Sequence, residues 1–257
     1  MLRGEFSTAK NFMSTRLVRT FSNSNVSKAV KMMVEFNVGS VIVDDNEGPV
    51  GVFTERDLIT KVLARQKKLE EPILLEVMTS SFDTLNQDAT LLDSAKIMRE
   101  KKGRLMVFDD GNLVGIVTAT DIVREIAKFG KPFDFKSAYS GRVYEESPVA
   151  KMELIVQLMA KRRIGSVIIS YKNVPSGIFT ERDLLRSILK SDFSMDSKVE
   201  DYATRNLVTA RYDINGLDAA RMMVEKHIKR LPLIRSGKLV GIVTARDLVE
   251  AFADSSW

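Results

Sequence analysis

The sequence predicts an α+β fold of four similar repeats, because one short phrase returns at nearly constant spacing. GVFTERDLI begins at Gly51, and GIVTATDIV, GIFTERDLL and GIVTARDLV begin at Gly115, Gly177 and Gly241. Successive glycines are 64, 62 and 64 residues apart, and alternate glycines are 126 apart. A fixed period of this length is typical of repeat proteins.

The four repeats are of two alternating kinds, so the chain is a pair of pairs. Repeats 1 and 3 carry VGSVIVDD from Val38 and IGSVIISY from Ile164 ahead of the phrase. Repeats 2 and 4 carry RLMVFDDGNLVGIVTA from Arg104 and RLPLIRSGKLVGIVTA from Arg230. We call repeats 1 and 3 odd and repeats 2 and 4 even.

Each repeat predicts the order strand, helix, strand, strand, helix. In repeat 1 a β-branched stretch at 17–21 precedes NVSKAVKMMVEF, whose apolar side chains recur at helical spacing. The strand signals SVIVDD and VGVFT follow, joined by the turn-forming DNEG, and a second helix is expected at about 55–64. A unit of roughly 60 residues buries only a marginal core, so each repeat should pair with a neighbour across its sheet.

Linkers are expected at RQKKLEEP, FGKPFDFK and SDFSMDS. They divide the chain into repeats 10–65, 73–128, 137–190 and 198–254. Repeats 1 and 2 should form one module, 10–128, and repeats 3 and 4 a second, 137–254. Because the halves are alike, the two modules are expected to form a disc with an approximate two-fold axis.

Composition removes several classes of function. The chain has no cysteine and one histidine, His227, so disulfides, thiolate sites and multi-histidine metal sites are excluded. No apolar run reaches the roughly 20 residues of a membrane span, and MLRGEFSTAK lacks a signal-peptide core, so we expect a cytoplasmic protein.

The net charge of +5 favours a solvated surface over a nucleic-acid groove. Lys and Arg balance Asp and Glu at 18 to 18 in residues 1–130 and outnumber them 21 to 16 in residues 131–257. Nucleic-acid binding rests on this excess alone and is kept as an alternative.

The threonine and aspartate of the phrase allow two interpretations. A Thr followed three residues later by an acid is nearly a capping box for the second helix. However, neither residue is exchanged for another capping residue in any of the four copies. A short carboxylate at a helix start can also accept hydrogen bonds from a ribose diol, while the hydroxyl and the first amides of the helix hold phosphate. The pattern therefore suits a nucleoside phosphate.

The repeat order, the strand phrase and the motif GhhTxxD resemble CBS domains over almost the whole chain. That family pairs two domains into a Bateman module whose clefts commonly bind adenine nucleotides or S-adenosylmethionine. Four such units in one chain resemble the gamma subunit of AMP-activated kinase in organisation. The resemblance implies that the motif Asp binds the ribose, that the motif Thr lies near the sugar or phosphate, and that the partner repeat completes the pocket.

The resemblance also implies which residues meet. In the first and third sites, Thr54 and Asp57 should face Arg104, and Thr180 and Asp183 should face Lys229 and Arg230. In the second and fourth sites, Thr118 and Asp121 should face Gly39 and Ser40, and Thr244 and Asp247 should face Gly165 and Ser166. Glycine there would let backbone amides approach a ligand closely.

The four sites should differ in charge. Arg56, Arg182 and Arg246 stand before the motif Asp and suit phosphate, whereas repeat 2 has Thr120 at that position. We therefore expect the more anionic ligand in the second module, and an empty or weakly charged site at Asp121.

The resulting prediction is a stand-alone sensor with AMP, ADP or ATP as regulatory ligand and no required metal. No Walker loop, HExxH or GxSxG is present, so an enzyme is not expected. A homodimer is expected, and the regulated effector would be a separate or identical chain. An S-adenosylmethionine sensor and a nucleotide-modulated nucleic-acid-binding protein are the alternatives.

Overall fold

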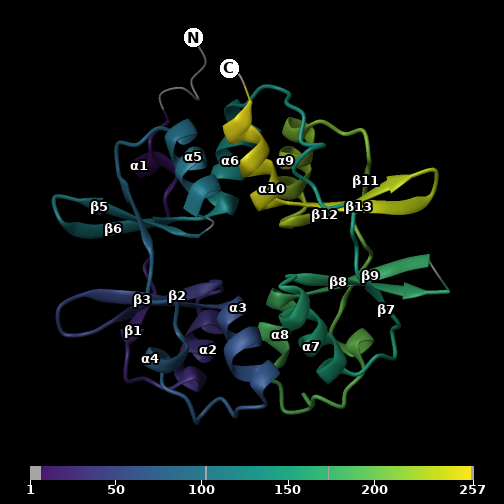
Figure 1. Cartoon of the computed structure of the whole chain (residues 1–257), viewed down its shortest axis with the longest axis horizontal. Helices are drawn as coiled ribbons and strands as arrows, with labels where there is room; N and C mark the ends of the chain where they lie inside the picture. Colours follow the sequence, from purple (N-terminus) through teal and green to yellow (C-terminus); the bar gives the residue numbers. More distant parts are fainter. Residues whose placement is uncertain (1–6, 102, 173, 256–257) are drawn as a thin grey trace. The chain divides into compact units, whose positions relative to one another are not determined.

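The computed structural model describes residues 7–101, 103–172 and 174–255. The chain divides into two compact units, each built from two alternate repeats (Figure 1). The 1/3 unit comprises Val18–Ser81 and Tyr144–Leu207. The 2/4 unit comprises Met1–Leu17, Phe82–Val143 and Val208–Trp257.

Each repeat contributes one small mixed sheet with its second strand in the centre. In repeat 1, β2 (Ser40–Asp44) pairs in parallel with β1 (Arg19–Phe21) and antiparallel with β3 (Pro49–Thr54). The other three sheets have the same arrangement, and a fourth strand joins that of repeat 3. Their strands are β4 (Asp83–Asn86), β5 (Leu105–Asp109), β6 (Asn112–Val117), β7 (Glu145–Glu146), β8 (Ser166–Tyr171), β9 (Val174–Thr180), β10 (Thr204–Arg205), β11 (Ala210–Arg211), β12 (Arg230–Arg235) and β13 (Lys238–Thr244).

The helices follow the predicted order, so the predicted α+β repeat is confirmed. α2 (Val26–Glu35) begins where Asn25 Oδ1 accepts the amide of Lys28 at 3.0 Å. A side-chain acceptor at this position satisfies one of the unpaired amides of the first turn. The corresponding helices are α5 (Leu91–Lys101), α7 (Met152–Arg162) and α9 (Gly216–Glu225), and the second helices of repeats 2 to 4 are α6 (Ala119–Phe129), α8 (Glu181–Ser187) and α10 (Ala245–Asp254).

The second helix of repeat 1 differs from the single helix expected at 55–64. It consists of α3 (Glu55–Asp57), the π-helix η2 (Leu58–Val62) and the 3₁₀-helix η3 (Leu63–Arg65). The hydroxyl of Thr60 donates to the carbonyl of Arg56 at 2.8 Å. A hydroxyl that bonds back to the preceding turn competes with the helical ladder and bends it.

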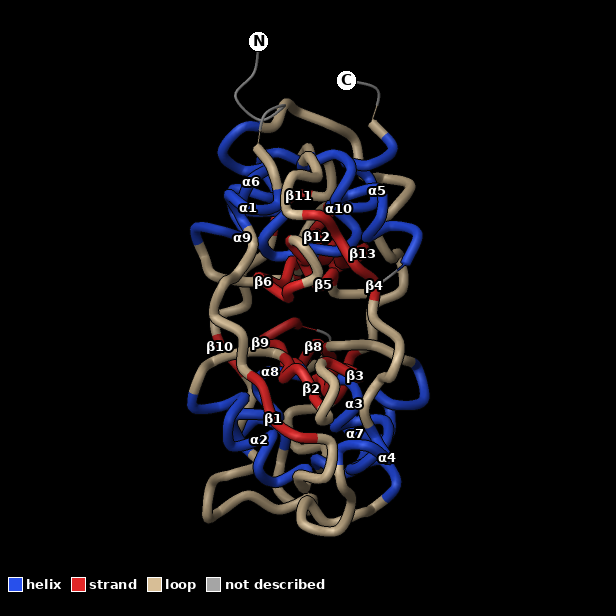
Figure 2. The backbone as a smooth tube through the Cα atoms, turned by 90° about the vertical axis from the view of Figure 1, so that its left-hand side faces the viewer, coloured by secondary structure: helices blue, strands red, loops and turns tan. Residues whose placement is uncertain are grey.

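Each unit has its own apolar core, formed by helices of two alternate repeats packed together (Figure 2). In the 1/3 unit, Val30 and Met33 of α2 are fully buried in one cluster with Val156 and Met159 of α7. In the 2/4 unit, α5, α6, α9 and α10 form the helical layer, and Ile122 and Leu248 are fully buried in it. Burial of such side chains contributes roughly 1.5 to 3 kcal/mol each, so these helix faces are the main source of stability.

A short segment at the start of each of the four repeats packs on a different repeat from its own. α4 (Leu74–Val77) follows the first linker. Thr79, two residues beyond this helix, forms an isolated β-bridge with Val52 of β3 in repeat 1. In repeat 3, Thr204 of β10 pairs with Ile178 of β9 after the turn η4 (Val199–Asp201). In the 2/4 unit, α1 (Ala9–Phe12) is followed by Ser14, which forms an isolated β-bridge with Ile116. Ser140 forms an isolated β-bridge with Ile242. We call these crossing segments; the linker pattern did not reveal them.

The crossing segments explain the repeated glycines, which lie inside the third strands. A Cβ added to Gly51 would lie 2.7 Å from the carbonyl oxygen of Thr79. One added to Gly177 would lie 2.8 Å from the carbonyl oxygen of Thr204. At Gly241 it would lie 3.0 Å from the carbonyl oxygen of Ser140, and at Gly115 it would strike the side chain of Met13. Glycine is therefore needed where another backbone or side chain crosses the strand.

None of the helices within the described residues is both long enough and apolar enough to cross a membrane.

Candidate functional site

All four motif threonines begin a helix, and all four motif aspartates close a capping box with them. The Thr amide donates to Oδ2 of the Asp three residues later, at 3.0 Å for Asp57, 2.9 Å for Asp121, 2.8 Å for Asp183 and 2.7 Å for Asp247. The capping interpretation therefore holds for one carboxylate oxygen. A carboxylate has about four acceptor positions, so capping does not use up the group.

In the odd repeats, the second oxygen, Oδ1, accepts a hydroxyl from the crossing segment. Thr79 Oγ1 donates to Asp57 at 3.0 Å, and Thr204 Oγ1 donates to Asp183 at 3.1 Å. Lys61 Nζ also lies 2.8 Å from Oδ1 of Asp57. Sequence reasoning missed Thr79, Thr204 and Lys61. The two threonines could have been found from their spacing in the sequence, because Thr79 follows Asp57 by 22 residues and Thr204 follows Asp183 by 21.

In the even repeats, the second oxygen has different surroundings. Arg124 Nη1 donates to Oδ1 of Asp121 at 3.1 Å, and half of the Arg124 side chain is exposed. Burial raises the pKa of Asp247, an effect that hydrogen bonds from Thr244 oppose. Burial of the Asp247 carboxylate therefore disfavours its charged form.

The other predicted contact residues lie at the same end of each sheet as the motif threonine. Ser40 pairs with Thr54 across β2 and β3, and the amide of Glu55 donates to the carbonyl of Gly39 at 3.2 Å. Equivalent contacts join Ser166 with Thr180, Glu181 with Gly165, Arg230 with Thr244, and Ala245 with Lys229. Arg104 directly precedes β5. Odd repeats thus present Gly and Ser at this end, whereas even repeats present a cation.

Each predicted site combines residues of the two compact units. Asp57 lies in the 1/3 unit and Arg104 in the 2/4 unit, and the same division separates Asp183 from Lys229 and Arg230. These pairings stay predictions.

Two arginines predicted to bind phosphate form ion pairs between repeats 1 and 3. Arg182 Nε lies 2.8 Å from Oε1 of Glu55, and Arg56 Nε donates to Oε1 of Glu181 at 3.1 Å. Arg182 Nη1 also donates to the carbonyl of Val38 at 3.2 Å. The Glu55 oxygen is buried and accepts no well-directed hydrogen bond, so its contact with Arg182 is mainly electrostatic. In the sequence, these ion pairs are indicated by the glutamate of TERD, which occurs in the odd repeats and is replaced by alanine in TATD and TARD of the even repeats.

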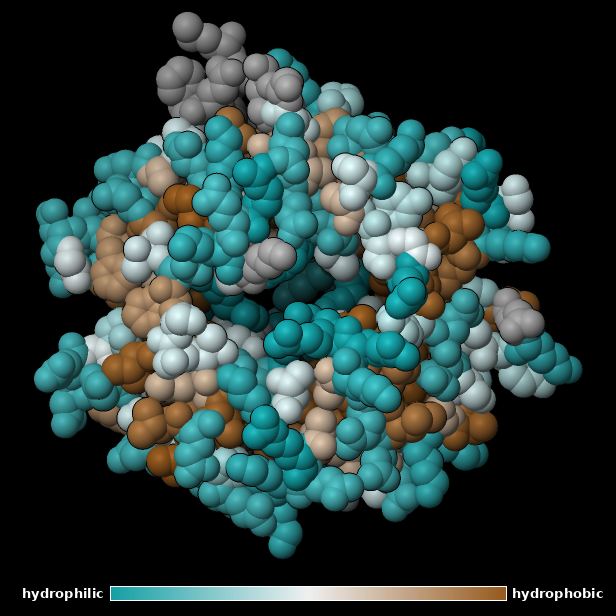
Figure 3. Space-filling view, viewed as in Figure 1, coloured by the Kyte–Doolittle hydropathy of each residue, from teal (hydrophilic) through white to brown (hydrophobic). Residues whose placement is uncertain are grey.

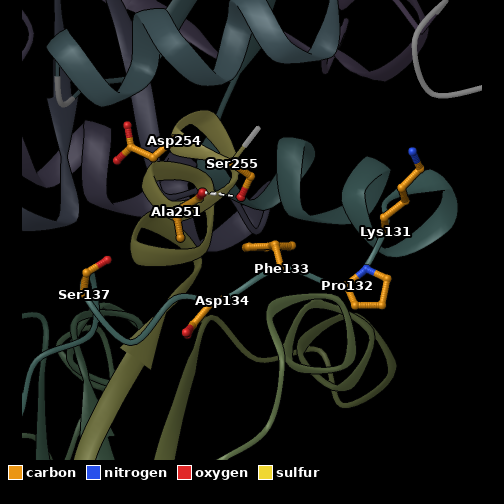
Figure 4. A pocket seen from close by; sticks show the side chains of 8 residues that line it. All are labelled: Lys131, Pro132, Phe133, Asp134, Ser137, Ala251, Asp254 and Ser255. Atoms are coloured by element: carbon orange, nitrogen blue, oxygen red, sulfur yellow. Dashed lines mark hydrogen bonds between the residues drawn. The ribbon is translucent and has the colours of Figure 1, made fainter. Parts of the chain in front are cut away.

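One pocket lies within the 2/4 unit, and none of the motif residues lines it. It measures about 430 Å³, lies between the segment after α6 and the end of α10, and contains one hydrogen bond among its lining residues, from Ser255 to Ala251 (Figure 4). Its lining is Lys131, Pro132, Phe133, Asp134, Ser137, Ala251, Asp254 and Ser255. One cation against two carboxylates does not favour an anionic ligand.

Exposed large hydrophobic side chains within the described part of the chain are confined to the 1/3 unit. Figure 3 shows brown, hydrophobic residues among the teal ones on the visible face. The exposed residues are Phe21, Leu75, Val149, Leu154, Tyr171, Val174 and Leu189. Hydrophobic residues exposed singly are normal in a folded protein.

The segments 9–64, 74–128, 147–190 and 199–254 each match the CBS domain. The chain belongs to the CBS-domain family. The resemblance predicted from the Thr and Asp motif is confirmed over most of the chain.

Archaeal CBS proteins are similar to this chain over much of its length. Protein MJ1225 of Methanocaldococcus jannaschii is 30% identical over 194 residues, which cover 68% of this chain and 69% of that protein. Its crystal structure, described as that of an archaeal homologue of the AMPK gamma subunit, superposes with a TM-score of 0.82 at 18% identity. That match covers 96% of this chain and 100% of the other, so the two share a fold.

Three further relatives define how far the similarity extends. An uncharacterised conserved protein from Pyrococcus horikoshii has a TM-score of 0.67 at 23% identity and covers 96% of this chain. A 33.4 kDa protein of Thermofilum pendens is 27% identical over 180 residues. The aligned region spans 59% of that protein and 48% of a second relative, from Methanopyrus kandleri.

Proposed function

We propose that this CBS protein is a regulatory sensor that binds adenine nucleotides through its Thr and Asp motifs and catalyses no reaction. The observation that carries the proposal is the fourfold Thr and Asp pair at a helix start, with a carboxylate whose second oxygen is not needed for capping. A carboxylate in this position can accept the hydroxyls of a ribose.

Asp183 illustrates the proposed chemistry. Its Oδ2 stays with Thr180, while the hydroxyl of Thr204 on Oδ1, at 3.1 Å, is exchanged for a ribose hydroxyl. This replaces one neutral donor by another, so it leaves no buried acceptor unpaired. The phosphates would lie near the N-terminus of α8, where the helix dipole favours an anion. Lys229 and Arg230 of repeat 4 would supply the counter-charge.

The output of the sensor would be a change in conformation or assembly. A ligand shifts such an equilibrium only if it binds the two states with different affinity. We propose a cytoplasmic protein that acts as a homodimer or on a separate effector chain. The similarity to MJ1225, whose crystal structure is described as that of a proposed archaeal homologue of γ-AMPK, supports a regulatory role.

Isothermal titration of the full chain with AMP, ADP, ATP and S-adenosylmethionine tests the proposal. We expect adenine nucleotides to bind, and Asp183→Ala to weaken binding at its site at least tenfold, since charged hydrogen bonds contribute about 1.5 to 3 kcal/mol each. Asp196→Ala is the matched control, because this exposed carboxylate of the same unit pairs only with Lys151 within the described residues. Binding of S-adenosylmethionine alone would change the ligand class, and no binding would overturn the proposal.

A further inference from the structure

The motif carboxylate of repeat 1 is more fully occupied than that of repeat 3. Asp57 Oδ2 accepts the amide and hydroxyl of Thr54 at 3.0 and 2.6 Å. Its Oδ1 accepts the hydroxyl of Thr79 at 3.0 Å and lies 2.8 Å from Nζ of Lys61. These four donors fill the acceptor positions of a carboxylate. The side chain of Asp57 is only 6% exposed.

Lys61 is held in place by more than Asp57. Its ammonium donates to the carbonyl of Met78 at 2.8 Å and to the hydroxyl of Thr79 at 3.3 Å. Both partners belong to the crossing segment that passes Gly51. Lys61 therefore joins the helix of the motif, the motif carboxylate and the crossing segment.

The other repeats have no cation at the equivalent position, four residues after the motif Asp. Repeat 3 has Ser187, whose hydroxyl is turned back to the carbonyl of Asp183 at 2.7 Å. Repeat 4 has Ala251, and repeat 2 has Glu125, which pairs with Lys128. Asp121 does have a cation, Arg124, but this side chain is 48% exposed, against 31% for Lys61.

We propose that Lys61 is an internal counterion that closes the Asp57 site to adenine nucleotides, so the chain binds fewer nucleotides than it has motifs. The inference rests on the function proposed above. A ribose diol needs two acceptor positions, and at Oδ1 of Asp57 one is held by the hydroxyl of Thr79 and the other by the ammonium of Lys61. Both ribose hydroxyls could therefore bind there only if the ammonium were displaced. The exchange would replace an ion pair by a contact in which only the carboxylate is charged, and it would leave the displaced ammonium without its counterion. At Asp183 the exchange is between neutral hydroxyls, so that site stays open.

Titration of AMP into single-site variants tests whether the Asp57 site is closed, and it leaves Lys61 unchanged. We expect Asp57→Ala to leave the number of AMP molecules bound per chain unchanged, whereas Asp183→Ala loses one. Loss of one AMP in Asp57→Ala would overturn the inference and leave the proposed function standing. No binding of AMP, ADP or ATP by the wild-type chain would overturn both.

Lys61→Ser places the residue of repeat 3 in repeat 1 and should open the site. We expect at least tenfold tighter binding at the weakest site or one additional AMP per chain, and loss of this gain in Lys61→Ser/Asp57→Ala. Lys31→Ser changes an exposed lysine of α2 in the same unit and should leave AMP binding unchanged. Unchanged binding by a Lys61→Ser chain that melts at the wild-type temperature would contradict the proposal. If the Lys61→Ser chain melts at a lower temperature than the wild type, the AMP titrations of Asp57→Ala and Asp183→Ala decide whether the Asp57 site is closed.

Discussion

Arg182 of repeat 3 and Glu55 of repeat 1 form an ion pair, with 2.8 Å between Nε and Oε1. Arg56 and Glu181 form the reciprocal pair at 3.1 Å. The two pairs are unequal, because the side chain of Arg182 is 21% exposed and that of Arg56 is 53% exposed. The same two residue types in the same motif therefore contribute differently to the 1/3 unit.

Arg182→Met should destabilise the fold by about 3 kcal/mol, because it leaves the buried carboxylate of Glu55 without its cation. Arg56→Met should cost at most about 1 kcal/mol, since exposed ion pairs contribute little. Urea unfolding of both variants measures the difference. Glu55→Gln/Arg182→Met should recover part of the loss, because no buried charge remains. Equal losses in the two single variants would show that Glu55 does not depend on Arg182.

Gly177→Ala should destabilise the protein by about 1 to 3 kcal/mol, the usual effect of overpacking. The new Cβ would lie 2.8 Å from the backbone carbonyl of Thr204, which cannot turn away as a side chain can. Gly141→Ala is the control, because a Cβ there meets nothing within 4 Å. Urea midpoints of the two variants give the comparison. A neutral Gly177→Ala would mean that the crossing segment is displaced at little cost.

ATP or ADP should bind more tightly than AMP to the sites of Asp183 and Asp247. Lys229, Arg230 and Arg246 are predicted to supply the counter-charge for the added phosphates, whereas Arg182 is ion-paired with Glu55. Competition titrations of Asp57→Ala/Asp121→Ala and Asp183→Ala/Asp247→Ala chains separate the two pairs of sites. We expect the first variant to keep the preference for ATP and the second to lose it. The same preference for AMP in both would refute the assignment.

Asp247→Asn should stabilise the protein increasingly as the pH rises from about 4 to 7. Burial raises the pKa of Asp247, so the folded chain holds this proton more tightly than the unfolded chain. The stabilisation from protonation is present at low pH and is lost as the pH rises through the raised pKa. The amide of asparagine is neutral throughout, and its oxygen can still accept the Thr244 amide. Urea unfolding of both chains across this range measures the effect.

Asp213→Asn provides a control of opposite sign. A side-chain hydrogen bond from Arg211 lowers the pKa of this exposed carboxylate. Its contribution is therefore present above the unfolded-state pKa and is lost as the pH falls. The variant should become relatively less stable with rising pH, and added salt should weaken the effect. The same slope for Asp247→Asn and Asp213→Asn would exclude burial as the cause at Asp247.

The sequence by itself determined the repeats, the order of their elements and the family. Helical spacing in NVSKAVKMMVEF and the turn residues of DNEG act over a few neighbouring residues, and they place α2, β2 and β3 within one or two residues of their observed bounds. The motif Thr and Asp are three residues apart, so their capping geometry is also a local property. The exception is η2, a π-helix in the segment where the pattern predicts a continuous helix.

Only the tertiary structure decided which distant residues share a core or a carboxylate. Repeats 1 and 3 pack through contacts of α2 with α8 and of α7 with η2 and η3. Glu55 meets Arg182 where α3 contacts α8, although neither local sequence pattern indicates this partner. The close approach of Thr79 to Gly51 and to Asp57 likewise depends on where the crossing segment lies. Periodicity reports which face of an element is buried, whereas the choice of partner depends on shape and charge brought together from separate parts of the chain.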